Sequence, residues 1–162
     1  MEALLDFLKT HGIEYQRFDH PAVFTCEESD LLPPMPGMPT KNLFLRNDKG
    51  DRFFLVTVGH GKSADLKALK AILGESKLSF GSPEALKALL GVEPGSVTLF
   101  GVLHDDDRKV QVVLDADIAS ASALQCHPLV NTGTLVISSA SMRKFLSITG
   151  HEPRTVDVPA RL

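Results

Sequence analysis

The sequence has little cysteine and no long apolar run. Its two cysteines, Cys26 and Cys126, lie far apart and form neither a CxxC pair nor a disulfide framework. Reduced thiols in a cytoplasmic protein are the simplest interpretation. No apolar stretch approaches the length that spans a bilayer, and the acidic, amphipathic start does not resemble a secretory signal. We therefore expect a cytoplasmic protein with no membrane partner.

Standard catalytic and cofactor motifs are also absent. The sequence contains no GxSxG, HExxH or CxxC motif and no Rossmann fingerprint. The glycine-bearing stretch at residues 59–63 lacks P-loop spacing, and the acidic triplet at residues 105–107 lacks EF-hand spacing. We expect no cofactor and no metal ion, and we interpret the triplet as a solvated hairpin tip. Both cysteines are interpreted as inert buried thiols.

Length and composition are those of one soluble globular domain spanning residues 1–162. The chain has 162 residues, of which 43% are hydrophobic and 23% charged. A net charge of −3 argues against strong non-specific binding of nucleic acid. Residues 41–90, however, carry nine basic and five acidic side chains. This segment forms either an anion-binding face or only the solvated sides of helices.

Predicted helices and strands are interspersed along the chain. Amphipathic periodicity and capping residues predict helices at residues 2–11, 64–73, 82–90 and 138–147, with a short one starting at Thr25. Strands are predicted at residues 13–18, 40–46, 53–58, 77–80, 97–103, 109–114, 123–127, 134–137 and 154–158. Residues 97–103 are apolar on both faces, which is typical of a central strand. The pattern predicts an α+β fold, a single mixed β-sheet with packed helices.

Lys41 stands at the junction of a rigid loop and a strand. The strand at residues 40–46 follows a proline-rich run at residues 33–39 and precedes a polar stretch at residues 47–50 that is predicted to form a turn. A lysine at such a junction can point into a cleft while the strand holds its backbone still. Alternatively, it is a solvated lysine that marks the strand end.

Two histidines stand directly before prolines, in His20-Pro21 and His127-Pro128. In one interpretation each histidine ends a strand and bonds the backbone. In the other, both loops line one cleft together with Lys41. Cys126 beside His127 does not indicate a catalytic dyad, because neighbours on a strand point to opposite faces.

A set of short stretches, in order over almost the whole chain, matches one family. These stretches are residues 14–15 with 20–25, 40–46, 65–67, 78–84, 91–98, 127–132 and 149–154. In them the chain resembles the YbaK-like family of prolyl-tRNA synthetase editing domains and their free-standing relatives, the trans-editing aminoacyl-tRNA deacylases. It most resembles the branch that clears alanine from mischarged tRNA-Pro.

The resemblance implies hydrolysis of the ester that joins an amino acid to the 3′-terminal adenosine of a tRNA. This ester is already activated, so a positioned water suffices and the protein supplies positioning and charge stabilisation. Lys41 carries over as the key lysine, acting on the terminal phosphate or on the developing oxyanion. The implied substrate-binding residues are Val23, Phe24, Leu31, Asn42, His127, Pro128, Asn131, Thr132 and Gly133. The first three would form the pocket wall, and residues 127–133 the loop around the aminoacyl group.

The resemblance also implies the partners. Mischarged tRNA, bound at its acceptor end, is the expected substrate, and prolyl-tRNA synthetase is a further candidate partner. A tight apolar pocket would admit alanine and exclude proline by a steric clash. Two alternatives stay open: a deacylase for another mischarged tRNA such as Cys-tRNA(Pro), and a non-catalytic module that binds tRNA or a synthetase.

Overall fold

The described residues form one mixed sheet with helices packed against it. The computed structural model describes residues 1–22, 27–28 and 31–161. Its helices are α1 (Glu2–Thr10), α3 (Leu66–Leu73), α4 (Pro83–Leu90), the 3-10 helix η1 (Leu99–His104), α5 (Ala116–Ser120) and α6 (Ser139–Ile148). Its strands are β1 (Gln16–Asp19), β2 (Met38–Asn47), β3 (Phe53–Gly59), β4 (Leu78–Phe80), β5 (Val110–Asp115), β6 (Ala123–Cys126), β7 (Gly133–Ser138) and β8 (Arg154–Val156). The strand order is β1-β7-β6-β2-β3-β5-β8, with β4 paired to β2, so the expected α+β fold is confirmed.

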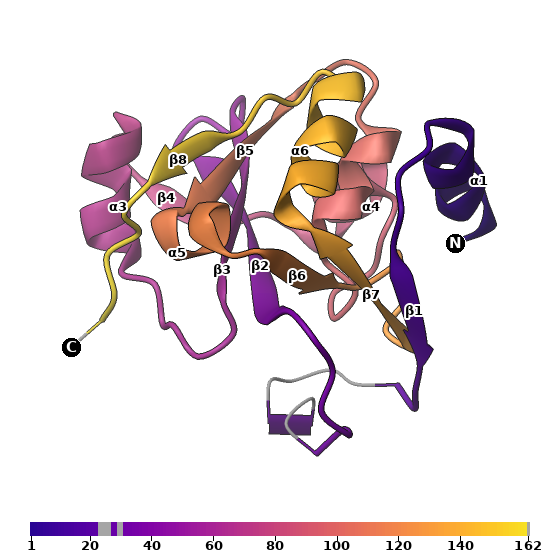
Figure 1. Cartoon of the computed structure of the whole chain (residues 1–162). Helices are drawn as coiled ribbons and strands as arrows, with labels where there is room; N and C mark the ends of the chain where they lie inside the picture. The colour runs from indigo at the N-terminus through magenta and orange to yellow at the C-terminus, as the bar shows by residue number, and fades with distance from the viewer. Residues whose placement is uncertain (23–26, 29–30, 162) are drawn as a thin grey trace.

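Strand β2 joins the two halves of this sheet (Figure 1). Its first residues pair in parallel with β6, and the rest of its length pairs antiparallel with β3. The predicted hairpin of β2 and β3 is confirmed. Its turn is held by Asn47, whose side-chain oxygen accepts the backbone N–H groups of Asp51 and Arg52. Gly50 supplies the left-handed residue that the turn requires, at φ +69°.

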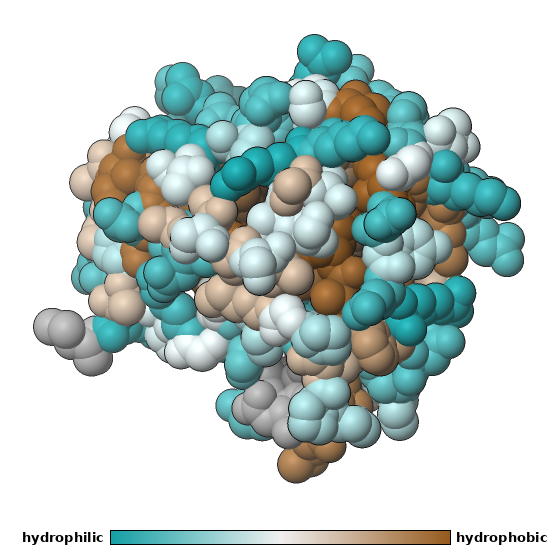
Figure 2. All heavy atoms as spheres, in the orientation of Figure 1, coloured by the Kyte–Doolittle hydropathy of each residue, from teal (hydrophilic) through white to brown (hydrophobic). Residues whose placement is uncertain are grey.

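Two hydrophobic clusters lie on opposite faces of β2. Phe44 belongs to the larger cluster, with residues of α1, α4, η1 and α6, whereas Leu45 belongs to the smaller one, with residues of α3. Side chains alternate along a strand, so this one strand contributes to both cores. Figure 2 shows apolar residues at the surface over α3 and α6, on a face that is otherwise mostly hydrophilic. None of the helices in the described ranges is both long and apolar enough to cross a membrane.

Side-chain caps decide where several helices begin. The Ser82 hydroxyl accepts a backbone N–H of the first turn of α4, and Pro83 takes the first helical position, as predicted. Asp65 caps α3 in the same way, so this helix starts at Leu66, slightly later than the sequence indicated. Ser138 caps α6. The predicted helix start at Thr25 lies outside the described residues.

The prediction of a central strand at residues 97–103 is wrong. The chain there forms η1, whose first turn is capped by the Thr98 hydroxyl, 3.4 Å from the backbone nitrogen of Phe100. Most of η1 is buried, and apolar residues on all sides fit a buried helix as well as a buried strand. A Cβ added to Gly101 would lie 3.0 Å from Cβ of Leu90, so a side chain there would push η1 away from α4.

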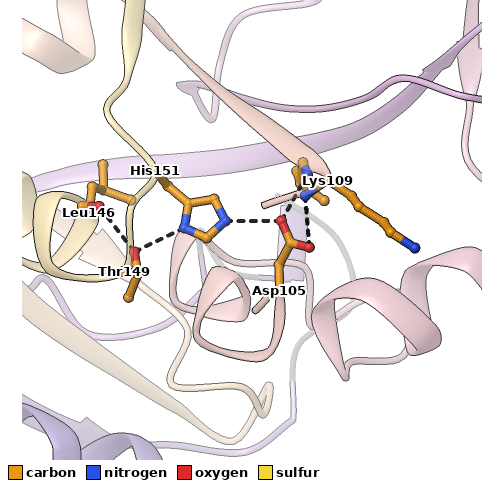
Figure 3. A network of polar contacts seen from close by, with 6 residues as sticks. Asp105, Lys109, Leu146, Thr149 and His151 are labelled. Atoms are coloured by element: carbon orange, nitrogen blue, oxygen red, sulfur yellow. Dashed lines mark hydrogen bonds and ion pairs between the residues drawn. The ribbon is translucent and has the colours of Figure 1, made fainter. Parts of the chain in front are cut away.

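The turn after η1 holds a buried carboxylate (Figure 3). Asp105 was expected to be solvated, but it is only 3% exposed. One of its oxygens accepts the Lys109 N–H at 3.1 Å; the other accepts the Val110 N–H at 2.8 Å and lies 2.9 Å from Nε2 of His151. Nδ1 of His151 lies 3.0 Å from the Thr149 hydroxyl. This network ties the start of β5 to the residues that follow α6.

Cys126 is a buried thiol of the larger cluster. It is free and 2% exposed, which confirms its predicted burial. Burial raises the pKa of this thiol from 9.0 to about 12, against a smaller opposing effect of a hydrogen bond with Thr40. Cys26 lies outside the described residues.

Replacing Asp105 by Asn should lower the free energy of unfolding by about 2–4 kcal/mol. The asparagine amide has one oxygen and one NH₂ group. Its NH₂ would face a donor that now bonds a carboxylate oxygen, so at least one buried N–H would lose its acceptor. Urea unfolding followed by circular dichroism measures the change. The control is Asp106→Asn at the exposed neighbouring position, which should stay within about 0.5 kcal/mol of the parent. Equal stability of the two variants would contradict the role of the network.

Cys126 should resist alkylation in the folded protein at pH 8. The thiolate is the reactive form, and with a pKa of about 12 only about one thiol in ten thousand is ionised at that pH. Peptide mapping after treatment with iodoacetamide should therefore find Cys126 modified only when the protein has been denatured first. Modification in the native protein at the rate of a solvent-exposed thiol would show that the site opens readily.

Candidate functional site

Lys41 and Asn42 point to opposite faces of β2. Asn42 pairs with Thr57, whose hydroxyl donates to the Asn42 side-chain oxygen at 2.6 Å. The Asn42 amide nitrogen lies 3.4 Å from the Val97 carbonyl, so this side chain is committed to contacts within the fold. Lys41 pairs with Val58, a residue of the smaller cluster, and is half-buried. Within the described residues, its amine has no hydrogen-bond or ion-pair partner.

The face of the sheet that carries Lys41 also carries the two histidines that precede prolines. β2 pairs in parallel with β6 through Pro39 and Gln125, and continuing this register by two residues sets Lys41 on the same face as His127, which directly follows β6. His20 reaches this face from the end of β1, with its Nε2 2.8 Å from the hydroxyl of Thr134 on β7. Its backbone N–H donates to the Thr132 carbonyl at 3.0 Å. The two histidine loops are thus joined directly.

Hydrogen bonds set the tautomers of both imidazoles. Nδ1 of His127 lies 3.2 Å from the Gly133 carbonyl, and a carbonyl only accepts, so Nδ1 carries the proton. Burial lowers the pKa of His127 below the ordinary value of 6.5, a backbone hydrogen bond opposes this, and the nearby His20 lowers it slightly further. The ring is therefore neutral at pH 7, and Nε2 is left as an acceptor. Nδ1 of His20 likewise donates to the Pro21 carbonyl, at 2.9 Å.

The loop after His127 is held in an unusual conformation. Leu129 has a positive φ of 71°, a region that residues with a side chain rarely adopt and that costs roughly 1–3 kcal/mol. Pro128 and Gly133 are buried, Asn131 is half-buried and Thr132 is exposed. Such strain persists only where the surroundings hold it, so the loop presents a fixed shape beside His127.

Of the three residues predicted to form the pocket wall, only Leu31 lies within the described residues. Leu31 is 86% exposed, so its side chain is open to a ligand but encloses nothing by itself. Val23 and Phe24 lie outside the described residues. A residue that sequence reasoning missed, Gln125, holds the proline-rich loop against this same face. No sequence signal links position 125 to residues 35–37, since the contact is purely tertiary.

Several basic residues of the middle segment are already paired with acids. Lys62 lies 2.5 Å from an Asp115 carboxylate oxygen and 3.0 Å from the Val158 carbonyl, which anchors the C-terminal residues to β5. Lys87 pairs with Glu93 at the surface, and the exposed Arg52 pairs with Glu75, whose side chain is largely buried. Exposed ion pairs contribute little to stability, but they reduce the charge that this segment offers to an anion. Lys41 is among the lysines of this segment whose amines have no partner within the described residues.

An open groove of about 800 Å³ is bordered by α1, by β1, β6 and β7, and by Pro36 of the proline-rich loop. It is lined by Leu5, Asp6, Lys9, Ile13, Glu14, Tyr15, Gln16, Pro36, Ala123, Val136, Ser138 and Ser141. Lys41 and both histidines are absent from its lining. Its charged residues are two acids and one lysine, so it does not favour an anion, and we place the candidate site at Lys41 and His127.

Comparison with known proteins gives sequence relatives over nearly the whole chain. The prolyl-tRNA editing protein ProX of Acetoanaerobium sticklandii is 34% identical over 157 residues, which cover 96% of this chain and 94% of that protein. Prolyl-tRNA synthetase associated domain-containing protein 1 of Danio rerio is 37% identical over 155 residues, covering 93% of this chain and 83% of the relative. The similarity therefore includes both histidine loops and β2.

A solved structure and a family model agree with these relatives. The crystal structure of a candidate trans-editing enzyme for prolyl-tRNA synthetase superposes with a TM-score of 0.73 at 20% identity, covering 98% of this chain and 96% of that one. At this identity the likeness shows a common fold. The family model of the aminoacyl-tRNA editing domain matches residues 20–145, from His20 to Phe145. The chain therefore belongs to the family of aminoacyl-tRNA editing domains.

Proposed function

We propose that this chain is a trans-editing deacylase that hydrolyses mischarged aminoacyl-tRNA, with Ala-tRNA(Pro) as its substrate. The proposal rests on a half-buried lysine without a described partner and a neutral histidine whose Nε2 is a free acceptor, which the register of β2 and β6, continued by two residues, sets on one face. Family membership supports the reaction class, and the names of two relatives refer to prolyl-tRNA and its synthetase.

The proposed reaction needs no covalent intermediate on the protein. Water adds to the ester carbonyl, the bond to the ribose oxygen breaks, and that oxygen takes up a proton as the free amino acid leaves. The carbonyl oxygen carries negative charge in the transition state, and a nearby ammonium stabilises it. Lys41 can supply this charge, or it can hold the terminal phosphate of the tRNA so that the ester is correctly placed.

His127 complements the lysine because it is an acceptor rather than a cation. With Nδ1 donating to the Gly133 carbonyl, its Nε2 can accept a hydrogen bond from the substrate ammonium, from the ribose hydroxyl or from the attacking water. Asn131, Thr132 and Gly133 would close the loop around the aminoacyl group. The Asn42 side chain bonds Thr57 and Val97, so we propose that it contributes by keeping β2 in place.

Selectivity would follow from the size of the aminoacyl pocket. We propose that Val23, Phe24 and Leu31 contribute its apolar wall, which admits alanine and excludes proline by a clash. The whole chain would act as one editing domain in the cytoplasm. It would recognise the acceptor end of the tRNA alone or together with prolyl-tRNA synthetase.

The test is amino-acid release from a panel of charged tRNAs, comparing the parent with Lys41→Ala. We expect release of alanine from Ala-tRNA(Pro), and a loss of about 10²–10³-fold in kcat/KM in the variant, as for other residues that stabilise transition-state charge. A fall in kcat indicates oxyanion stabilisation, and a rise in KM indicates a phosphate contact. The exposed Lys67→Ala on α3 is the matched control.

Each other result of the panel has a defined meaning. Full activity in Lys41→Ala would contradict the role of this lysine. Release of cysteine instead of alanine would replace the substrate but keep the reaction. A salt-sensitive tRNA complex without release of any amino acid would exclude the deacylase and favour a non-catalytic binding module.

The activity should depend on pH through His127. The lowered pKa keeps the ring neutral down to below pH 6.5, so kcat/KM, corrected for spontaneous hydrolysis, should be level near pH 7. It should fall at lower pH, as protonation removes the acceptor at Nε2. In His127→Asn the residual activity should no longer fall at low pH, that is, the acid limb of the pH profile should disappear. The exposed control His104→Asn should keep this limb. An unchanged acid limb in His127→Asn would rule out His127 as its source.

A further inference from the structure

His20 bonds the chain on both sides of Gly133. Its backbone N–H donates to the carbonyl of Thr132 at 3.0 Å, and its Nε2 lies 2.8 Å from the hydroxyl of Thr134. Because Nδ1 donates to the Pro21 carbonyl, Nε2 is an acceptor and the Thr134 hydroxyl donates to it. Thr134 is only 5% exposed, so this bond is shielded from water. His20 therefore holds both neighbours of Gly133 against the end of β1.

The carbonyl of Gly133 faces the other way, towards β6. Strand β7 lies between β1 and β6 (Figure 1), and the backbone groups of successive residues point alternately to the two neighbours. The pairing of Cys126 with Leu135, continued by two residues, sets Gly133 opposite Pro128. In agreement, a Cβ at Gly133 would lie 3.6 Å from Cγ of Pro128. A proline has no N–H, so at this position β6 offers the carbonyl no backbone donor.

The imidazole of His127 supplies the donor that the proline lacks. Its Nδ1 lies 3.2 Å from the Gly133 carbonyl, and this bond is what keeps the proton on Nδ1 and leaves Nε2 as an acceptor. The carbonyl belongs to the planar peptide unit that joins Gly133 to Thr134. Holding Thr134 in place therefore holds the direction of the carbonyl, and with it the tautomer of His127.

Both imidazole nitrogens of His20 are used within the fold. Nδ1 bonds the Pro21 carbonyl and Nε2 bonds the Thr134 hydroxyl, so neither is left to bond a substrate or to take up its proton. His127 differs, because its Nε2 has no hydrogen-bond partner within the described residues. The two histidines before prolines therefore have different roles, and His20 can affect a reaction at His127 only through the contacts that join them.

We propose that His20 is a positioning residue for His127. Through Thr134 it directs the Gly133 carbonyl, which keeps the proton of His127 on Nδ1 and leaves Nε2 to accept a hydrogen bond from the substrate or the attacking water. Pro128 contributes by leaving this carbonyl open to the imidazole. The inference rests on the proposed deacylase function, and it adds a residue that acts on the reaction without contacting the ester.

The first experiment observes the tautomer of His127 without any substrate. Nitrogen NMR with labelled histidine distinguishes protonated from unprotonated ring nitrogens, and the signals lost in His127→Asn identify this ring. At about pH 8, where imidazoles are neutral, the parent should show the proton on Nδ1 alone. Thr134→Val has a similar shape but no hydroxyl, and it should show a mixture of both tautomers. Thr134→Ser keeps the hydroxyl and should restore the parent spectrum, and the exposed Thr155→Val on β8 is the control.

A double variant guards against a simple loss of folding. Thr134→Val alone leaves Nε2 of His20 without its donor. His20→Phe combined with Thr134→Val replaces both partners by apolar side chains of similar shape, a change that can be nearly neutral for stability. Circular dichroism checks that this variant is folded. It should show the same mixture of His127 tautomers as Thr134→Val.

The second experiment measures kcat/KM for release of the amino acid from charged tRNA. We expect a fall of about ten- to a hundredfold in Thr134→Val, the range in which the outer partners of metal-ligating histidines act. Thr134→Ser should recover the activity of the parent. In the background of His127→Asn, Thr134→Val should have almost no further effect, because both substitutions act through the same ring.

The two readouts separate the possible failures. An unchanged tautomer in both Thr134→Val and the double variant would overturn the control of His127 by His20. A changed tautomer with full activity would overturn its role in the reaction. An equal loss of activity with and without His127 would show that Thr134 acts on the fold alone. If the parent releases no amino acid from any charged tRNA, the proposed deacylase fails and the role of His20 in the reaction fails with it; the NMR spectra then still test the control of the tautomer.

Discussion

The alternation of side chains along β2 is the constraint on which the rest of the structure depends. One face of this strand supplies Phe44 to the larger hydrophobic cluster, and the other supplies Leu45 to the smaller one. A shift by one residue would exchange the two sets and move Lys41 to the face that Asn42 now occupies. The two cores therefore fix the register, and the register fixes the face on which Lys41 stands. The position of the candidate site therefore depends on the packing of the two hydrophobic clusters, whose residues take no part in the proposed chemistry.

The second constraint is that buried polar groups need partners. Asp105 accepts three hydrogen bonds at the start of β5, and Asp115 is bonded by Lys62 and the backbone of Val158. Both carboxylates lie at connections between elements, where backbone N–H groups would otherwise remain unpaired. These networks hold loops rather than substrates. They leave Lys41 as a half-buried cation whose charge is not used by the described part of the fold.

The candidate site is held by strands and by the loops that follow them. Lys41 lies on β2, His127 directly follows the neighbouring β6, and the His127 loop is joined to His20 through Thr134 and Thr132. The proline-rich residues before β2 are held by the Gln125 side chain, which bonds three of their carbonyl oxygens, and by the close approach of Gly37 to Val136 and Ala123.

The sequence by itself determined most of the local structure of this protein. Ser82 and Pro83 mark a helix start, the turn at Asn47 and Gly50 marks a hairpin, and the ordered motifs indicate the family, because caps, turns and motifs depend on neighbours in the chain. Only the tertiary structure decided that residues 99–104 coil against Leu90, that Asp105 is buried beside His151, and that the Gln125 amide bonds the carbonyls of residues 35–37. In each of these cases the deciding partner is distant in sequence, and no local pattern encodes a contact of that kind.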